Sequence, residues 1–257
     1  MIIIKYLSFI KKGFCKALRL YKNRFIFYND YNFLKFLLFA YSSRTIIKIR
    51  MKESSGKLIC RSKTSDVATL METFLNHFHN PPSNLDRDAI ILDLGSNVGY
   101  TLVNLHYYYP NAKFIGVEMD KENYDFAMKN VTHIKNCVLI NAACWKNGGE
   151  ITYCGKESNS FSICTSNYTN QKHVKAITID QIMNYTNIEY IDFIKMDIEG
   201  AETEVICNFG NWINKTNSMN IELHYTDGSE IIKCLMEHGF NCYIDTNRPY
   251  SVLALKE

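Results

Sequence analysis

The stretch that decides the fold is AIILDLGSNVGYT, residues 89–101. An apolar run ends on Asp93, and Gly95 and Gly99 then bracket a small polar turn. A buried run followed by glycines is typical of a β-strand that turns sharply into a helix, because glycine adopts backbone conformations that other residues avoid. We therefore predict a strand over 89–94 and a helix over 99–109, which Pro110 ends.

Strand and helix patterns alternate downstream of this turn. Apolar strands that do not alternate with polar residues indicate a parallel sheet covered by helices on both faces, so the predicted fold class is α/β. Two short closing segments would add an antiparallel edge. The predicted strands are 113–119, 137–143, 176–180, 190–200, 218–225, 241–245 and 250–256, and the main predicted helices are 121–131, 201–209 and 228–240.

The residues before this core have a different character. Residues 45–60 read as a hairpin with ESSG as its turn, and a helix capped by Ser65 or Asp66 follows. The segment NPPSNLDRD, at 80–88, breaks the chain with two prolines. We therefore predict an N-terminal extension over 1–80 and a ligand-binding domain over 81–257. The Gly-rich and Ser-rich stretch 147–166 is assigned no element.

Charge divides the chain in the same way. Residues 1–63 hold 15 Lys and Arg against 2 Asp and Glu, whereas residues 64–257 hold 14 against 24. The basic, aromatic segment 1–40 predicts either a helix on an anionic membrane surface or helices packed on the domain. The acidic body would repel phosphates, so nucleic acid is not an expected partner.

Cysteine and histidine usage argues against a metal or disulfide framework. The nine cysteines are scattered singly, which is typical of reduced thiols in a cytoplasmic protein. His77 and His79 stand two apart with no further ligand near them in the sequence. We therefore assign no metal ligands.

The carboxyl ends of the predicted strands carry acids, amides and small residues. Ligands of open α/β sheets bind at this edge, so these residues are the predicted site. No Lys or Arg stands among them, which favours a ligand with hydroxyls, a purine edge and a positive centre over a phosphate. The predicted ligand-binding residues are Asp93, Gly95, Ser96, Asn97, Gly99, Glu118, Met119, Asn141, Ala142, Ala143 and Asp197.

Individual roles follow from chemistry and spacing. Gly95 and Gly99 lack a Cβ, so the backbone can approach a ligand there, and Asp93 would order the loop or reach an ammonium group. Glu118 lies 23 positions after Gly95, where an acid at the end of a strand can accept both hydroxyls of a ribose. The dinucleotide fingerprint G-x-G-x-x-G would need glycine at the position of Asn97, so a nicotinamide enzyme is disfavoured.

The segment DIEGAE, residues 197–202, has two interpretations. Asp197 would cap the following helix, with Glu199 and Glu202 near its positive end. Alternatively, the carboxylates face something positive or hydroxylic across the strand end, which would explain why so many of them stand together.

Several of these segments resemble one family. ILDLGSNVGYT, VEMDKENYDFAMKN, LINAACW, IDFIKMDIEGAETEVI and the earlier RSKTSD are similar to the FkbM-type S-adenosylmethionine-dependent methyltransferases, and the resemblance runs from Arg61 to Glu222. It implies a seven-stranded, Rossmann-like class I methyltransferase fold and O-methylation of a hydroxyl, often on a sugar, polysaccharide or polyketide. Met119 stands where the family commonly has proline.

The resemblance also implies a mechanism. An acceptor hydroxyl, on a small molecule or a glycan, would attack the donor's methyl group in line, with Asp197, Glu199 or His224 as the catalytic candidates. A divalent ion between Asp197, Glu199 and substrate would suit Mg²⁺, although nothing in the pattern requires one. The alternatives are a nicotinamide or nucleotide-sugar oxidoreductase on a similar fold, or a non-catalytic binding module tethered to a membrane.

Overall fold

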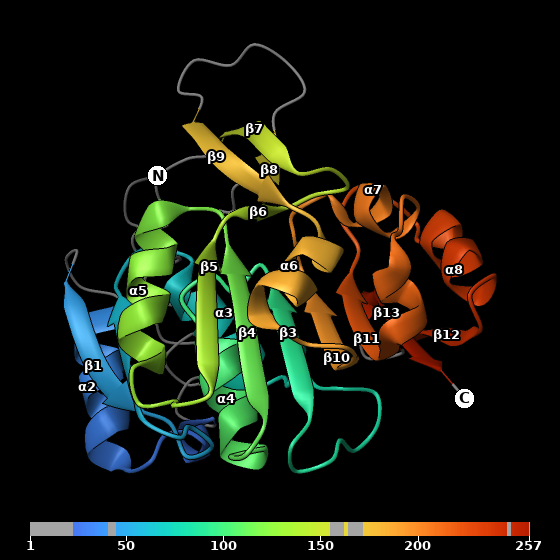
Figure 1. Ribbon diagram of the computed structural model, residues 1–257. Helices are drawn as coiled ribbons and strands as arrows, with labels where there is room; N and C mark the ends of the chain where they lie inside the picture. The colour runs from blue at the N-terminus through green and yellow to red at the C-terminus, as the bar shows by residue number, and fades with distance from the viewer. Residues whose placement is uncertain (1–22, 41–44, 155–161, 164–171, 246–247, 257) are drawn as a thin grey trace, which may run out of the picture.

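A seven-stranded sheet forms the centre of the protein (Figure 1). The computed structural model describes residues 23–40, 45–154, 162–163, 172–245 and 248–256. Five neighbouring strands are parallel, and the last strand of the chain runs antiparallel to both of its neighbours. This confirms the predicted α/β class and its antiparallel edge. The strand order is β12 (Phe240–Asp245), β13 (Arg248–Lys256), β11 (Thr216–Glu222), β10 (Ile191–Met196), β3 (Ile90–Leu94), β4 (Lys113–Glu118) and β5 (Cys137–Asn141).

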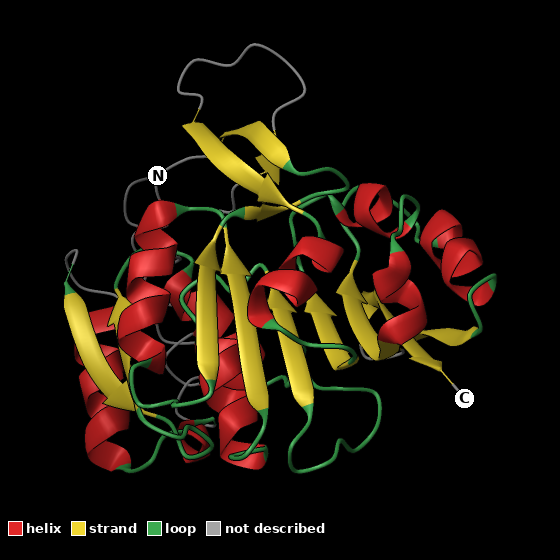
Figure 2. Cartoon of the chain, in the orientation of Figure 1, coloured by secondary structure: helices red, strands yellow, loops and turns green. Residues whose placement is uncertain are grey.

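Helices cover both faces of this sheet (Figure 2). Successive strand residues point to opposite faces, so Ile91 and Leu92 on β3 belong to two separate apolar cores. The first core contains residues of α3 (Asp66–Phe74), α4 (Tyr100–Tyr108) and α5 (Lys121–Val131). The second contains residues of α6 (Ile179–Thr186), α7 (Glu202–Ile206), the 3₁₀ helix η2 (Asn211–Lys215) and α8 (Ser229–Met236).

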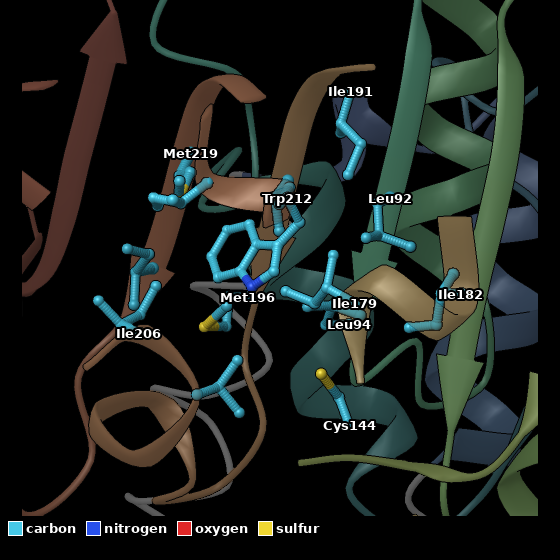
Figure 3. Close-up of a cluster of buried hydrophobic side chains, with 14 of the residues drawn as sticks. Leu92, Leu94, Cys144, Ile179, Ile182, Ile191, Met196, Ile206, Trp212 and Met219 are labelled. Atoms are coloured by element: carbon cyan, nitrogen blue, oxygen red, sulfur yellow. The ribbon is translucent and has the colours of Figure 1, made fainter. Parts of the chain in front are cut away.

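The second core packs around Trp212 (Figure 3). Its indole lies among side chains from β3, β10, β11 and α6, and it is only 2% exposed. A large buried ring of this kind contributes several kcal/mol, about 3–5 when it is truncated to alanine. This packing fixes the strands whose carboxyl ends carry the predicted site.

The N-terminal segment is joined to the same domain. The 3₁₀ helix η1 (Arg24–Ile26) and α2 (Asp30–Ala40) precede the predicted hairpin, which is present as β1 (Ile46–Arg50) and β2 (Lys57–Arg61). Tyr100 Oη donates to the Ile59 carbonyl at 2.9 Å, and the Ile59 N–H donates to Asn130 Oδ1 at 2.7 Å. Side chains from η1, α2, the hairpin and α3 therefore share the first core with the sheet, and the division at residue 80 stays a prediction.

The outer face of α2 is apolar. Phe33 and Phe36 are buried against the domain, whereas Tyr31, Leu34 and Leu38 are each more than half exposed. Membrane contact through residues 1–40 stays a prediction, and residues 1–22 lie outside the described part of the chain. None of the helices that the structure describes combines the length and the apolar character needed to cross a bilayer.

Predicted elements between residues 137 and 180 differ from the structure. Of the expected strand 176–180, only Ala176 and Ile177 lie in a strand, which belongs to a second sheet, and Ile179 begins α6. The expected strand 137–143 leaves the main sheet at Ala142, and β6 (Ala143–Cys144) pairs elsewhere. It joins β7 (Gly149–Cys154), β8 (Ser162–Ile163) and β9 (Lys172–Ile177) in a four-stranded sheet beyond the carboxyl ends of β4 and β5 (Figure 1). The stretch 147–166 thus contributes strands that we did not predict, and 155–161 and 164–166 lie outside the described residues.

Candidate active site

Backbone strain marks the loops that leave three neighbouring strands. Asn97 after β3, Glu199 after β10 and Tyr225 after β11 are non-glycine residues with φ of 49°, 56° and 59°. This left-handed conformation costs about 1–2 kcal/mol per residue and persists where a site requires it. The strain therefore points to the same edge of the sheet as the acids and amides.

The glycines at this edge allow close packing of the chain against itself. A Cβ on Gly95, whose φ is +76°, would lie 1.8 Å from the Asp197 carbonyl oxygen. A Cβ on Gly99 would press on Ala127 and Val131 of α5 at 3.3 Å. On the side where a Cβ would stand, these glycines therefore make room for Asp197, directly after β10, and for α5, whereas their contact with a ligand stays a prediction.

The first cavity at this edge, the Glu118 cavity, has an open volume of about 620 Å³. That figure includes space open to the solvent, and the enclosed volume is about 60 Å³. Most of the predicted ligand-binding residues line it: Gly95, Asn97, Glu118, Met119, Ala142, Ala143 and Asp197. Five residues that we did not predict also line it: Ser65, Val117, Asn123, Cys144 and Ile198. Glu199, which we predicted as a catalytic residue, completes the wall.

Glu118 is the acid at the base of this cavity. One carboxylate oxygen accepts the N–H of Asn97 and the other that of Asp120, both at 2.8 Å. Burial raises the pKa of Glu118 to about 7, although these two N–H groups favour the ionised form. Each oxygen keeps a second lone pair, so hydroxyl donors of a ligand would stabilise the carboxylate.

Asp93 does not line either cavity. It is fully buried, and Lys195 Nζ lies 3.2 Å from its Oδ1. Lys195 also donates to the Gly95 carbonyl at 2.7 Å, and the pKa of Lys195 is raised because Asp93 and Asp197 outweigh its desolvation. The predicted contact of Asp93 with a ligand ammonium group is therefore wrong, because Lys195 takes that place.

The expectation of an edge without cations is wrong for the same reason. Lys195 lies within β10, yet its side chain reaches the loop after β3. Strand pairing sets Lys195 directly beside Asp93. Neighbouring strands are far apart in the sequence, so this cation was not visible in the pattern of strand ends.

The remaining predicted ligand-binding residues, Ser96, Gly99 and Asn141, stabilise the loops that follow β3 and β4. Ser96 Oγ donates to the Asp93 carbonyl at 2.8 Å, and Gly99 precedes α4. Asn141 Nδ2 donates to the carbonyls of Glu118 and Met119 at 2.8 and 3.1 Å. Gly99 and Asn141 line neither cavity, and Ser96 lines the second one.

The second cavity, the His79 cavity, has an open volume of about 900 Å³ and adjoins the first. The two share Ser65, Gly95, Asn97, Asp197 and Glu199 in their walls. All three predicted catalytic residues, Asp197, Glu199 and His224, line it. The structure adds Ala68, Thr69, Glu72, His79, Thr101, Lys195 and Glu222.

The DIEGAE loop is held by Glu202. Its Oε1 accepts the Ile198 N–H and its Oε2 the Gly200 N–H, both at 3.0 Å. The N-cap of α7 is Ala201, so the interpretation of Asp197 as a helix cap is wrong. With Glu202 closing the loop, the Asp197 side chain lies in the wall between the two cavities.

Three carboxylates surround the imidazole of His224. Its Nδ1 lies 3.0 Å from Glu202 Oε1, and its Nε2 lies 3.5 Å from Glu199 and 3.9 Å from Asp197. Burial opposes the charge, but Glu202, Asp197 and Glu199 together raise the pKa of His224 to about 9. An imidazolium has no lone pair to accept a proton, so Asp197 and Glu199 are the better candidates for a general base.

Glu222, at the end of β11, is an ionised carboxylate. Burial disfavours its charge, but the facing His79 imidazole and the guanidinium of Arg248, which is hydrogen-bonded to it, lower its pKa to about 2. Glu72 on α3 lies close enough to Glu222 to be affected by its charge. The pKa of Glu72 is raised, first by burial and then by the negative charge of Glu222. The His79 cavity is therefore rich in negative charge.

Arg61 fastens the segment RSKTSD to the domain. It contacts Asp66 at 2.7 Å, Glu122 at 3.0 Å and Asn123 Oδ1 at 2.6 Å. Asp66 is thereby engaged by Arg61, and the Ser65 side chain makes no capping hydrogen bond to α3. Ser65 is the N-cap residue of α3, as predicted, but without a capping bond from its side chain, and it also stands in the walls of both cavities.

Comparisons with known proteins assign the family. The profile described as "Methyltransferase FkbM domain" matches residues 93–242, which is more than half of the chain. A search of curated proteins finds no match.

Solved structures with related folds share little sequence. Fibrillarin from Methanococcus jannaschii is 16% identical, with 84% of this chain and 83% of that chain covered and a TM-score of 0.44. Precorrin-6y C5,15-methyltransferase from Geobacter metallireducens is 12% identical, with coverages of 66% and 81% and a TM-score of 0.43. Likenesses this distant say nothing about an acceptor, so the assignment depends on the family profile. The chain belongs to the FkbM family of methyltransferases, whose methyl donor is S-adenosylmethionine.

Proposed function

We propose that this methyltransferase transfers the methyl group to a hydroxyl of an uncharged sugar or glycan. The observation that carries the proposal is the shared wall of the two cavities, with Asp197 and Glu199 between them. A donor in the Glu118 cavity and an acceptor in the His79 cavity would meet at this wall. Alignment of two reactants in this way is a large part of catalysis.

The residues of the Glu118 cavity fit the donor. Glu118 is the acid that would accept the ribose hydroxyls, and the apolar Val117, Met119 and Ala142 would contact the adenine. The loop Gly95–Asn97 would hold the amino-acid part. When bound, S-adenosylmethionine supplies a methyl group activated by a positive sulfur.

Charge in the His79 cavity selects the acceptor. The four carboxylates of this cavity, on Glu72, Asp197, Glu199 and Glu222, outnumber its basic side chains, Lys195, His79 and His224, so a phosphate or carboxylate on the acceptor would be disfavoured. Hydroxyl groups, by contrast, can donate to each carboxylate oxygen. Asp197 and Glu199 would orient the reacting hydroxyl and receive its proton. This chemistry favours neutral polyhydroxyl acceptors.

The test is transfer of a tritiated methyl group to a panel of saccharides. Methyl glycosides of neutral hexoses should be labelled, whereas glucuronic acid and glucose 6-phosphate should be labelled at least about tenfold less, in line with the penalty for like charges. The variant Asp197→Asn should transfer almost nothing. Preferential labelling of the anionic sugars, or of no saccharide at all, would contradict the proposed acceptor class.

A further inference from the structure

His79 is a buried histidine that the proposed reaction does not yet use. It lies before the matched family segment, in a stretch held against the sheet by β11 and β13. Asn220 Nδ2 donates to the carbonyls of Phe78 and Asn80 at 3.0 and 2.9 Å, and Arg248 also donates to that of Phe78. These bonds on both sides fix the position of the imidazole in the cavity wall.

The free nitrogen of this imidazole faces two carboxylates. His79 is 6% exposed, and its Nε2 has no hydrogen-bond partner among the described residues. It lies 3.8 Å from Asp197 Oδ2 and 3.9 Å from Glu222 Oε2, and the three atoms all lie within 4.8 Å of one another. Such separations are too long for hydrogen bonds but suit atoms that coordinate a common ion.

The other nitrogen of His79 also has a polar neighbour, which would orient the ring as the second nitrogen of a metal-binding histidine is usually oriented. His79 Nδ1 lies 3.1 Å from Thr101 Oγ1. When Nδ1–H donates to this hydroxyl and a metal ion displaces any proton on Nε2, the lone pair of Nε2 is available on the side of Asp197 and Glu222. The carboxylates are themselves supported, Asp197 by Lys195 at 3.5 Å and Glu222 by Arg248.

These two cations weaken the attraction for a metal ion but do not cancel it. Around the cavity, Lys195, Arg248 and His224 face a larger set of carboxylates. That set comprises Glu72, Asp93, Asp197, Glu199, Glu202 and Glu222. A surplus of negative charge in a partly buried cavity favours a cation.

A neighbouring cluster of Asp197, Glu199 and His224 is a poorer choice. The Nδ1 of His224 lies 3.0 Å from Glu202 Oε1, and its Nε2 lies 3.5 Å from Glu199, so the ring is already engaged by carboxylates on both sides. Between the two clusters, only that of His79 offers a nitrogen without a partner.

We propose that His79, Asp197 and Glu222 bind one divalent transition-metal ion in the acceptor cavity. One imidazole nitrogen and two carboxylate oxygens suit Mn²⁺, Fe²⁺, Co²⁺ or Zn²⁺ better than Ca²⁺, which prefers oxygen alone. The ion would bind the acceptor oxygen, lower the pKa of its hydroxyl and leave Glu199 to take the proton. This consequence rests on the proposed function, whereas the binding of the ion does not.

The experiment titrates the full, metal-free chain with Mn²⁺ and follows binding by electron paramagnetic resonance. One ion per chain should bind, and a nitrogen coupling should appear in the pulsed spectrum. His79→Asn should remove that coupling and weaken binding by at least about tenfold, since second-sphere changes alone cost that much. His77→Asn is the matched control: His77 is in the same segment, its Nε2 lies 3.7 Å from Glu53, and asparagine tolerates its φ of 52°.

The possible results distinguish failure of the metal site from failure of the proposed acceptor class. Absence of Mn²⁺ binding below millimolar concentration, or equal binding by wild type and His79→Asn, would overturn the metal site. If a chelator leaves methyl transfer unchanged while His79→Asn abolishes it, the imidazole acts directly and the proposed role of the ion in the reaction is overturned. Mn²⁺ bound through nitrogen supports the site even if no saccharide is labelled, a result that counts only against the acceptor class.

Discussion

Gly95→Ala should destabilise the protein by about 3–5 kcal/mol and weaken S-adenosylhomocysteine binding at least a hundredfold, because it combines backbone strain with a steric clash. The new Cβ would lie 1.8 Å from the Asp197 carbonyl oxygen, closer than real atoms approach. The ends of β3 and β10 would have to separate, and residues from both ends line the Glu118 cavity. Urea unfolding and calorimetric titration measure the two effects.

Gly239→Ala provides the matched control. Gly239 has φ +82°, similar to that of Gly95, but a Cβ there would meet nothing within 4 Å. Only the left-handed strain remains, about 1 kcal/mol, and ligand binding should stay as in wild type. If the two variants lost equal amounts of stability and ligand affinity, the clash with the Asp197 carbonyl could not be the cause of the effect in Gly95→Ala.

Lys195→Met should lower the free energy of unfolding by about 3–5 kcal/mol, because it leaves a buried carboxylate without its cation. Lys195 and Asp93 are 2% and 0% exposed, and Nζ lies 3.2 Å from Oδ1. Neither oxygen of Asp93 has a hydrogen-bond partner among the described residues, so nothing else compensates its charge. Urea unfolding again measures the change.

The double variant Asp93→Asn/Lys195→Met should recover more than half of that loss, since no charge is then left unpaired. Lys121→Met is the control for removing a lysine. It breaks the exposed pair of Lys121 with Asp125, which are 67% and 47% exposed at their side chains. That change should cost less than about 0.5 kcal/mol. A small effect of Lys195→Met, or no recovery in the double variant, would contradict the importance of the buried pair.

Local patterns predicted the sheet because they reflect local physics. The apolar runs before Asp93 and after Tyr190 lie in β3 and β10, and the glycine turn follows at the expected place. Strand-end residues such as Glu118 and Asp197 were placed at one edge because parallel strands end together. The small sheet of β6 to β9 was missed because the stretch 147–166 is rich in glycine and serine, and two of its strands have only two residues.

Contacts between residues far apart in the sequence could not be predicted from the residues at the strand ends. The sequence pattern places Lys195 inside a strand, and only the pairing of that strand with β3 brings Lys195 beside Asp93. His79 had no ligand near it in sequence, yet the chain returns Asp197 and Glu222 to within 4 Å of it. Cys207 and Cys234, which are also isolated in sequence, meet with their Sγ atoms 2.6 Å apart. In each case the fold brings together residues that are far apart in the sequence.

Calorimetric titration of S-adenosylhomocysteine at pH 6 and pH 8 tests the central claim, that Glu118 holds the donor at the edge of the sheet. The pKa of Glu118 is raised to about 7, and on the proposed function ribose hydroxyls would bind its ionised form. The ionised fraction falls as the pH drops below 7, so binding should be about tenfold weaker at pH 6 than at pH 8. At pH 6 about one proton should be released per ligand, and Glu118→Gln should bind weakly with no dependence on pH. An affinity equal at both pH values, or unchanged in Glu118→Gln, would contradict the account.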